Sequence, residues 1–161
     1  MSHVGVIDGL RFAESASEIS GTLTDEELPR LSGSDCRVEQ VVFSVRGGTS
    51  SKGRPCLRVT AQAELVLVCQ RCLEPMACSV PVDSDLELSQ SLEEIEQADD
   101  DIDRVLAAQS MDVAQLVEDE VILALPVAPR HESCTPHADG DELKRASPFD
   151  VLARLKQGGR Q

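Results

Sequence analysis

Aromatic residues are nearly absent from this chain of 161 residues, which contains three Phe and neither Trp nor Tyr. Its hydrophobic core must therefore be built from Val, Leu, Ile and Ala. Long apolar runs are missing too, since no stretch approaches the roughly 18 apolar residues that span a bilayer. The N-terminus also lacks the basic region followed by an apolar region that marks a secretory signal. These absences predict a cytoplasmic protein without a membrane partner.

Basic residues are scarce as well, with 15 Lys and Arg against 29 Asp and Glu and a net charge of -14. The length suits one domain. Weak hydrophobicity combined with strong charge predicts that sizeable parts of the chain are loops or poorly ordered. The acidic balance argues against a long phosphate-binding surface, because such a surface needs clustered Lys and Arg.

The most regular pattern begins at residue 37, where three segments favour β-structure. Segment 37–46 is rich in β-branched residues, segment 56–69 alternates apolar and polar residues, and segment 76–89 follows a turn with the sequence CQRCLEP. Pro81 in the third segment indicates an edge strand or a bulge. Three successive strands joined by turns predict an antiparallel meander with one solvated face.

One strong helix pattern follows, with Asp112 as its N-cap and Pro126 as its end. Its second half, 121–125, has the sequence VILAL, which is apolar all round and predicts insertion into the core. The acidic residues 118–120 fall within one helical turn and point in different directions, which predicts a polar helix face. The alternative is that they pair with Arg71 or with bases near it.

Together these patterns predict an α+β fold, in which an antiparallel β-meander, either open or partly closed into a barrel, is packed by one main helix. A short C-terminal helix is predicted from Ser147, with Pro148 at its first position. Near the N-terminus, Thr24 and Glu27 have the spacing of a capping box. The expected organisation is an N-terminal helical or loop segment 1–35, a single α+β domain 36–156 and a disordered tail 157–161.

Charge is segregated along the chain. Residues 37–82 contain six basic and three acidic residues, whereas residues 83–103 contain ten acidic residues and no basic one. The acidic loop 93–103 is predicted to be solvated and mobile, and its functional interpretation is attraction of a basic partner such as a ribosomal protein. The segment RVLAA that follows it favours a short strand. The basic residues that could form a partner-binding face are Arg46, Lys52, Arg54, Arg58 and Arg71.

Two residues separate Cys69 from Cys72, and this pair has three interpretations. A thiol oxidoreductase places such a pair before a helix that lowers the thiol pKa, but here Pro75 and a strand follow. A structural zinc site needs four N or S ligands, of which the pair supplies half. The third interpretation is two thiols half-buried at a turn, with no ligand. A disulfide framework is not expected in the cytosol.

The segment RHESCTPH after the main helix offers the other half of a metal site, because it contains His131, Cys134 and His137. His131 and Cys134 are also separated by two residues. The predicted site has three thiolates and one imidazole, from Cys69, Cys72, His131 and Cys134. No Gly-rich phosphate loop, HExxH or GxSxG motif is present, so no catalytic set is predicted. The other cysteines, interpreted as small strand or turn residues, are Cys36, Cys56 and Cys78.

Three motifs in this order resemble those of the large ribosomal RNA subunit accumulation proteins, the YceD family: CQRCLEP after a strand, VEDEVILALPVAPRH with a following Cys, and PFDVLARLK. The likeness covers roughly residues 36–156. The resemblance implies a cytoplasmic, non-enzymatic factor needed for normal accumulation of 23S ribosomal RNA, and hence for large-subunit biogenesis. It also implies a zinc site, since many members pair the first CxxC with further cysteines after LALP. Cys69, Cys72 and Cys134 stand at matching places, and His131 stands where some members have Cys.

Two mechanisms fit these expectations. An adaptor or chaperone would shield a basic ribosomal protein or another assembly factor with its acidic loop, and would affect ribosomal RNA indirectly. Alternatively, the basic strand face would contact ribosomal RNA directly. The adaptor is favoured, because phosphate neutralisation needs a continuous basic footprint. A thiol oxidoreductase that uses Cys69 and Cys72 is the enzyme alternative.

Overall fold

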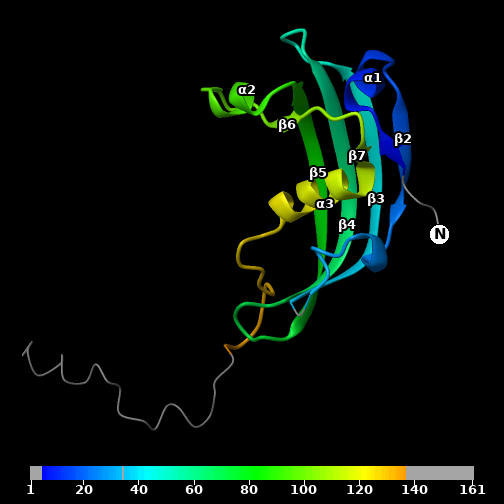
Figure 1. The fold of residues 1–161 in the computed structure, drawn as a ribbon. Coiled ribbons are helices and arrows are strands. Elements are labelled where there is room, and N and C mark those ends of the chain that lie inside the picture. The colour runs from blue at the N-terminus through cyan, green and yellow to red at the C-terminus, as the bar shows by residue number, and fades with distance from the viewer. Residues whose placement is uncertain (1–4, 34, 137–161) are drawn as a thin grey trace, which may run out of the picture.

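The computed structural model describes residues 5–33 and 35–136. The predicted C-terminal helix from Ser147, the predicted tail 157–161 and His137 therefore lie outside the described residues. The described part is organised around a five-stranded sheet with the strand order β2-β3-β4-β5-β6 (Figure 1). Its strands are β2 (Glu18–Leu23), β3 (Cys36–Thr49), β4 (Pro55–Val68), β5 (Pro75–Ser89) and β6 (Arg104–Leu106).

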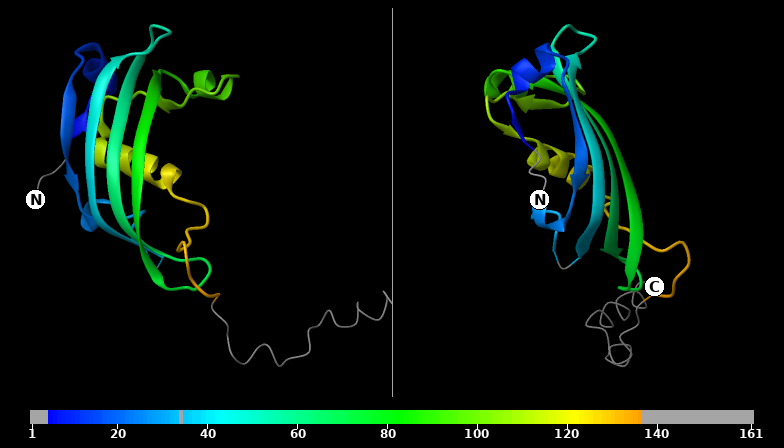
Figure 2. Two further views of the ribbon diagram at one scale, coloured as in Figure 1. Left: turned by 180° about the vertical axis from the view of Figure 1, so that it is seen from behind. Right: turned by 90° about the vertical axis from the view of Figure 1, so that its right-hand side faces the viewer.

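The three long strands β3, β4 and β5 form the predicted antiparallel meander. Val45 lies opposite Val59, which in turn lies opposite Ser84. The alternation predicted for the second segment is confirmed, because inward residues of β4 are buried while Arg58, Gln62 and Glu64 between them are exposed. In the described residues β2 and β6 form the two edges, so the sheet is open and does not close into a barrel. Figure 2 shows the strands curving around the side on which the main helix lies.

The main helix, α3 (Val113–Ala124), packs across this concave face. It begins as predicted, because the Asp112 carboxylate accepts hydrogen bonds from the backbone N–H groups of Ala114 (2.8 Å) and Gln115 (3.2 Å). The core contains four aliphatic residues of this helix, packed against inward residues of β4 and β5. These four are Val113, Leu116, Val117 and Val121.

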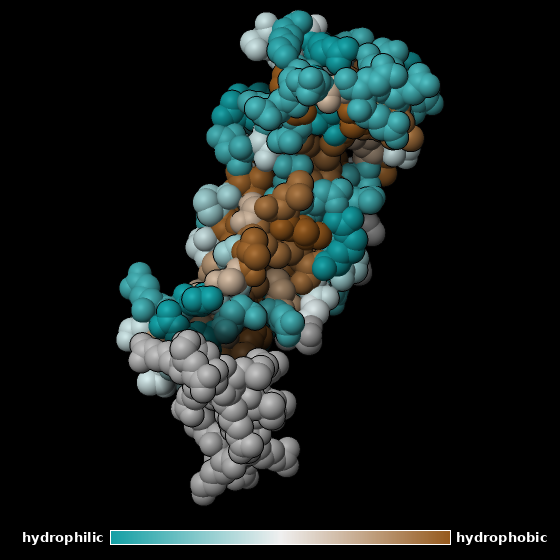
Figure 3. Space-filling model, turned by 90° about the vertical axis from the view of Figure 1, so that its left-hand side faces the viewer, coloured by the Kyte–Doolittle hydropathy of each residue, from teal (hydrophilic) through white to brown (hydrophobic). Residues whose placement is uncertain are grey.

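The C-terminal end of α3 corrects one prediction. Segment 121–125 was expected inside the core, and this holds only in part. Val121 is buried and Ile122 and Leu125 pack against the core, but Leu123 is 79% exposed and Val127 beyond the helix is fully exposed. Figure 3 views the molecule from the side toward which this end points and shows apolar side chains gathered in the middle of that face. A helix lying on one sheet buries one stripe of its surface, so an all-round apolar sequence leaves part of itself in solvent.

The acidic residues of α3 correct a second prediction, because Glu118 and Glu120 are buried and do not form a polar surface. The Glu118 carboxylate accepts hydrogen bonds from the backbone N–H groups of Arg30 (2.6 Å) and Leu31 (3.1 Å). The Arg30 guanidinium lies 3.3 Å from the same carboxylate. These donors offset the cost of removing the charge from water. The base that Glu118 pairs with is therefore Arg30, and not Arg71.

The N-terminal segment packs onto the same body. It contains β1 (Val6–Ile7), α1 (Gly9–Glu14) and the short 3-10 helix η1 (Asp25–Glu27). β2 pairs antiparallel with β3, and β1 pairs with β7 (Met111–Asp112) directly before α3. The predicted capping box is confirmed, because the backbone N–H of Thr24 donates to the Glu27 carboxylate at 3.0 Å. Sequence patterns gave no sign of β2, and for the region of α1 they predicted only a helical or loop segment.

Candidate metal centre and charged surface

The hairpin turn between β4 and β5 holds the first two candidate ligands. Cys69 N–H donates to the carbonyl of Glu74 (2.9 Å), and Leu73 N–H donates to the carbonyl of Cys69 (2.9 Å). Leu73 has a left-handed backbone with φ of 62°, a conformation that costs a non-glycine residue about 1–2 kcal/mol. The turn thereby folds back tightly enough to bring the Cys69 and Cys72 side chains to one side.

The segment that follows α3 brings the other two ligands to this turn. Gln70 N–H donates to the carbonyl of Pro129 (2.8 Å), and His131 N–H donates to Cys69 Sγ (3.4 Å). The Arg71 side chain donates to the carbonyl of Cys134 at 3.4 Å. These contacts join residues about sixty positions apart in the sequence.

The four predicted ligands form a cluster that could hold a metal ion. One ligand atom from each of Cys69, Cys72, His131 and Cys134 lies within 4.8 Å of the others. Cys69 Sγ is 3.8 Å from Cys134 Sγ, and Cys72 Sγ is 3.3 Å from His131 Nδ1. Tetrahedral zinc with its usual bond lengths separates two sulfurs by about 3.8 Å, and a sulfur and a nitrogen by about 3.5 Å. The donor set therefore matches a tetrahedral centre in composition, and these two separations are close to those of such a centre.

The pKa values of Cys69 and Cys134 are shifted in opposite directions. Burial pushes the pKa of Cys69 upward, but hydrogen bonds from the backbone N–H groups of Cys72, His131 and Arg71 outweigh burial and lower it to about 5. The pKa of Cys134 is raised by burial and by its hydrogen bonds with the neighbouring thiols. One sulfur is thus held as a thiolate at neutral pH, which is the form that binds a metal ion.

The surroundings of the pair also bear on the redox interpretation. A reactive cysteine needs a thiolate that a substrate can reach, usually at the N-terminus of a helix. Cys69 has no exposed surface, and β5 follows the turn directly. The low pKa of Cys69 therefore fits metal binding better than attack on a disulfide. The other three cysteines are free and lie within strands β3, β4 and β5, as interpreted from the sequence: Cys36, Cys56 and Cys78.

The five basic residues predicted as a partner-binding face do not form one free surface. Four of them lie close to carboxylates of the same chain: Arg46 with Glu18 (2.9 Å), Lys52 with Asp100 (3.0 Å), Arg54 with Glu94 (3.0 Å), and Arg58 with Asp83 (2.9 Å) and Asp85 (3.8 Å). The fifth, Arg71, donates to a carbonyl beside the cysteine cluster.

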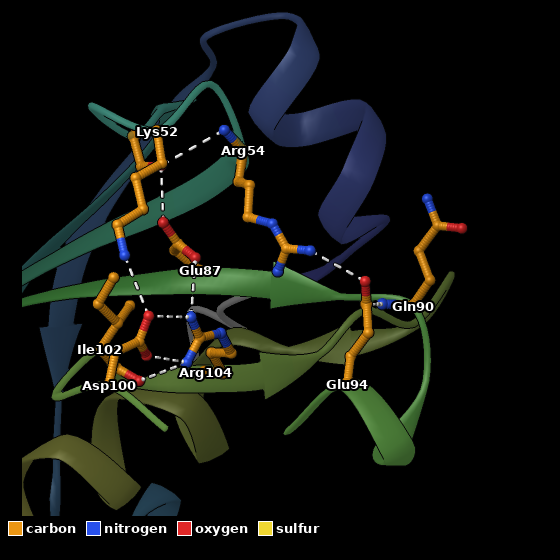
Figure 4. Close-up of polar contacts among 9 residues, drawn as sticks. Lys52, Arg54, Glu87, Gln90, Glu94, Asp100, Ile102 and Arg104 are labelled. Atoms are coloured by element: carbon orange, nitrogen blue, oxygen red, sulfur yellow. Dashed lines mark hydrogen bonds and ion pairs between the residues drawn. The ribbon is translucent and has the colours of Figure 1, made fainter. Parts of the chain in front are cut away.

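The acidic segment that supplies Glu94 and Asp100 is held against the sheet and is not simply a loop. It contains α2 (Leu92–Glu96) and leads into β6, which runs parallel to the end of β5. The Asp100 carboxylate accepts hydrogen bonds from both terminal nitrogens of Arg104 as well as from Lys52. Figure 4 shows Arg104 from β6 between Asp100 and Glu87.

Two buried residues anchor this network, and neither was among the predicted site residues. The side chains of Arg104 and Glu87 are only 8% and 4% exposed, and they lie 3.7 Å apart. The Ser50 hydroxyl donates to the other Glu87 oxygen at 2.7 Å. A sequence signal existed in the single Arg that ends the acidic run. Its partner on β5 could not be identified without the strand pairing.

Comparison with known proteins agrees with the resemblance. The family model described as large ribosomal RNA subunit accumulation protein YceD matches residues 57–156. The match covers more than half of the chain, so the chain belongs to the YceD family. No solved structure matches it. Among the described residues, no helix is both long enough and apolar enough to cross a membrane.

Proposed function

We propose that this protein is a cytoplasmic, non-catalytic ribosome biogenesis factor that promotes 23S ribosomal RNA accumulation and large-subunit assembly. It acts as an adaptor or chaperone for a basic ribosomal protein or another basic assembly factor. Membership of the YceD family supports the link with large-subunit RNA. The adaptor mechanism is inferred from the charges on the molecule.

The observation that carries the adaptor mechanism is the pairing of the basic strand face with the chain's own carboxylates. RNA binding needs several Lys and Arg side chains that can each neutralise a phosphate. Lys52 and Arg54 are already paired with the acidic segment. The segment has surplus charge beyond these pairs, on exposed residues without a described ion pair: Glu93, Glu96, Asp99, Asp101 and Asp103. That surplus favours a basic polypeptide over an RNA as the direct partner.

Zinc fits the cysteine cluster in this proposal, because three thiolates and one imidazole are typical of structural zinc sites. Cys69, Cys72 and Cys134 would bind it through sulfur and His131 through Nδ1. The ion would supply a cross-link between the β4–β5 hairpin and the segment after α3. This role is architectural, since a closed set of four protein ligands leaves no position for a substrate.

The adaptor proposal is tested by capture of partners with the purified full-length chain. We expect the wild-type protein to retain basic ribosomal proteins, with an affinity that falls as salt rises. The test variant E93Q/E96Q/D99N removes three charges from the acidic segment and should lose most of this binding. The matched control E14Q/E26Q/E74Q removes three exposed charges elsewhere and should retain it.

Ribosomal RNA serves as the competing ligand in the same experiment. Wild-type protein should bind a 23S fragment weakly at physiological salt. Tight, steeply salt-dependent RNA binding by wild-type protein, with equal partner capture by both variants, would replace the adaptor with a direct RNA-binding module.

A further inference from the structure

We propose that Lys52 and Arg54 form a phosphate-binding surface for RNA, and that the acidic segment 90–103 occupies this surface in cis. The inference extends the proposed function, since a basic partner that captures the acidic segment would uncover the two cations. Binding of the partner to the acidic segment would thus leave Lys52 and Arg54 free to contact ribosomal RNA.

The two cations lie close together on the chain and face one segment. Lys52 lies in the turn between β3 and β4, and Arg54 directly precedes β4. Lys52 Nζ is 3.0 Å from Asp100 Oδ2, and Arg54 Nη2 is 3.0 Å from Glu94 Oε1. Figure 4 shows both side chains reaching across to the acidic segment. A carboxylate at this distance offers the same charged oxygen acceptors as a phosphate group.

The space between the turn and the acidic segment is a cleft of about 390 Å³. Three cations line it, namely Lys52, Arg54 and Arg104, and three carboxylates oppose them: Glu87, Glu94 and Asp100. Glu87 is buried and tied to Ser50, so it belongs to the floor of the cleft. The carboxylates that can leave are Glu94 and Asp100, and without them the cleft becomes a site of net positive charge.

The ion pairs between the acidic segment and the two cations can mask Lys52 and Arg54, yet a competing partner can displace them. Glu94 also accepts the backbone N–H of Gln90 (3.1 Å), and Asp100 also pairs with Arg104. Both masked cations are substantially exposed, at 54% for Lys52 and 40% for Arg54. Exposed ion pairs are individually weak and sensitive to salt. A partner with several cations can therefore compete with Lys52 and Arg54 for the acidic segment, and it must also replace the two hydrogen bonds from the buried Arg104 to Asp100.

The test measures RNA affinity of purified full-length variants without any partner protein. The variant E94Q/D100N removes the two masking charges, and E93Q/D99N removes two exposed charges that have no described ion pair with the basic residues. Binding of a labelled 23S ribosomal RNA fragment is followed by fluorescence anisotropy over a range of salt concentrations. We expect E94Q/D100N to bind about five- to tenfold more tightly than E93Q/D99N.

The salt dependence identifies the groups that bind the RNA. Two new phosphate contacts to a single strand should steepen the slope of log affinity against log salt by about 1.4. Adding K52Q/R54Q to the unmasked variant should return both affinity and slope to the level of E93Q/D99N. The single variant E94Q leaves the Arg104–Asp100 pair intact and should show part of the gain in RNA affinity. A partial gain in this variant would show that the effect does not come from misfolding of the double variant.

Three results would overturn the inference. Equal gains for E94Q/D100N and E93Q/D99N would indicate a general effect of net charge. A gain that persists in the presence of K52Q/R54Q would place the RNA elsewhere. Saturation of the cleft by inorganic phosphate without any gain for RNA would make it a small-anion site. Failure of the adaptor proposal would be distinguished from these results, because wild-type protein would then capture no basic ribosomal protein.

Discussion

Removal of the proposed zinc should release the segment after α3 while leaving the sheet folded. Two of the ligands, Cys69 and Cys72, sit in a hairpin between long strands, whereas the segment that carries the others has no helix or strand of its own among its described residues. Its described backbone link to the hairpin is the bond from Gln70 N–H to the Pro129 carbonyl (2.8 Å). Amide exchange at Gln70 therefore reports whether the two halves of the site are joined.

The size of the effect follows from linkage. Free zinc at 100 times its dissociation constant stabilises the closed form by about 2.7 kcal/mol, which corresponds to about a hundredfold slower amide exchange. The variant C69S should lose the zinc and exchange its Gln70 amide about a hundredfold faster than the loaded wild type. The variant C56S is the matched control, because Cys56 is a free cysteine in β4 outside the cluster.

Two measurements decide this prediction. Elemental analysis should find about one zinc per chain in wild-type protein and in C56S, and well under one in C69S. Hydrogen exchange followed by mass spectrometry or NMR should show the Gln70 change with little change in the amides of β4. Retention of zinc by C69S, or identical Gln70 exchange with and without the metal, would refute the reasoning.

Three further predictions concern other contacts. E118A should lower the free energy of unfolding by about 3 kcal/mol, measured by urea denaturation, because it leaves buried backbone N–H donors without an acceptor. E118Q should lower the free energy of unfolding by less, since its amide oxygen can still accept a hydrogen bond. G47A should cost about 1–3 kcal/mol in the same assay, since a Cβ there would overlap the backbone of Phe12, whereas the space beside Gly48 is open and G48A should be mild. The Gln90 backbone lowers the pKa of Glu94, and Arg104 lowers that of Asp100. The unfolded chain therefore binds more protons as the pH falls below about 4–5, so these pairs stabilise at neutral pH and are lost in acid. The melting temperature of E94Q/D100N should fall less steeply in acid than that of E93Q/D99N, and an identical fall would contradict the role of the pairs.

The meander was predictable because its signal is local and repeated. Alternating apolar residues over a segment as long as 56–69 can bury one face only as a strand, and turn residues between such segments set an antiparallel order. The start of α3 was predictable for a similar reason, since the Asp112 side chain acts on N–H groups two and three residues ahead. By contrast, β2 is a short edge strand whose structure comes from pairing with β3.

The cysteine cluster was only partly predictable from the sequence. Spacing indicated each half of the site, because two residues between ligands suit a tight turn. The hydrogen bonds that join the halves, such as that from His131 N–H to Cys69 Sγ, left no mark in the sequence. The charge pairs were less visible still. Segregated charge was evident, but which carboxylate meets Lys52 or Arg54 depends on where the crossover between β5 and β6 passes.

The amino-acid sequence by itself determined the strand meander, the start of the main helix, the four residues of the candidate metal centre and the family. All of these depend on neighbours within a few positions, or on motifs that can be recognised in the sequence before the fold is known. The tertiary structure alone decided that Glu118 is buried, that Leu123 near the end of α3 is exposed, and that the acidic segment lies on Lys52 and Arg54. Those outcomes depend on contacts between distant segments, whose energies no local pattern encodes.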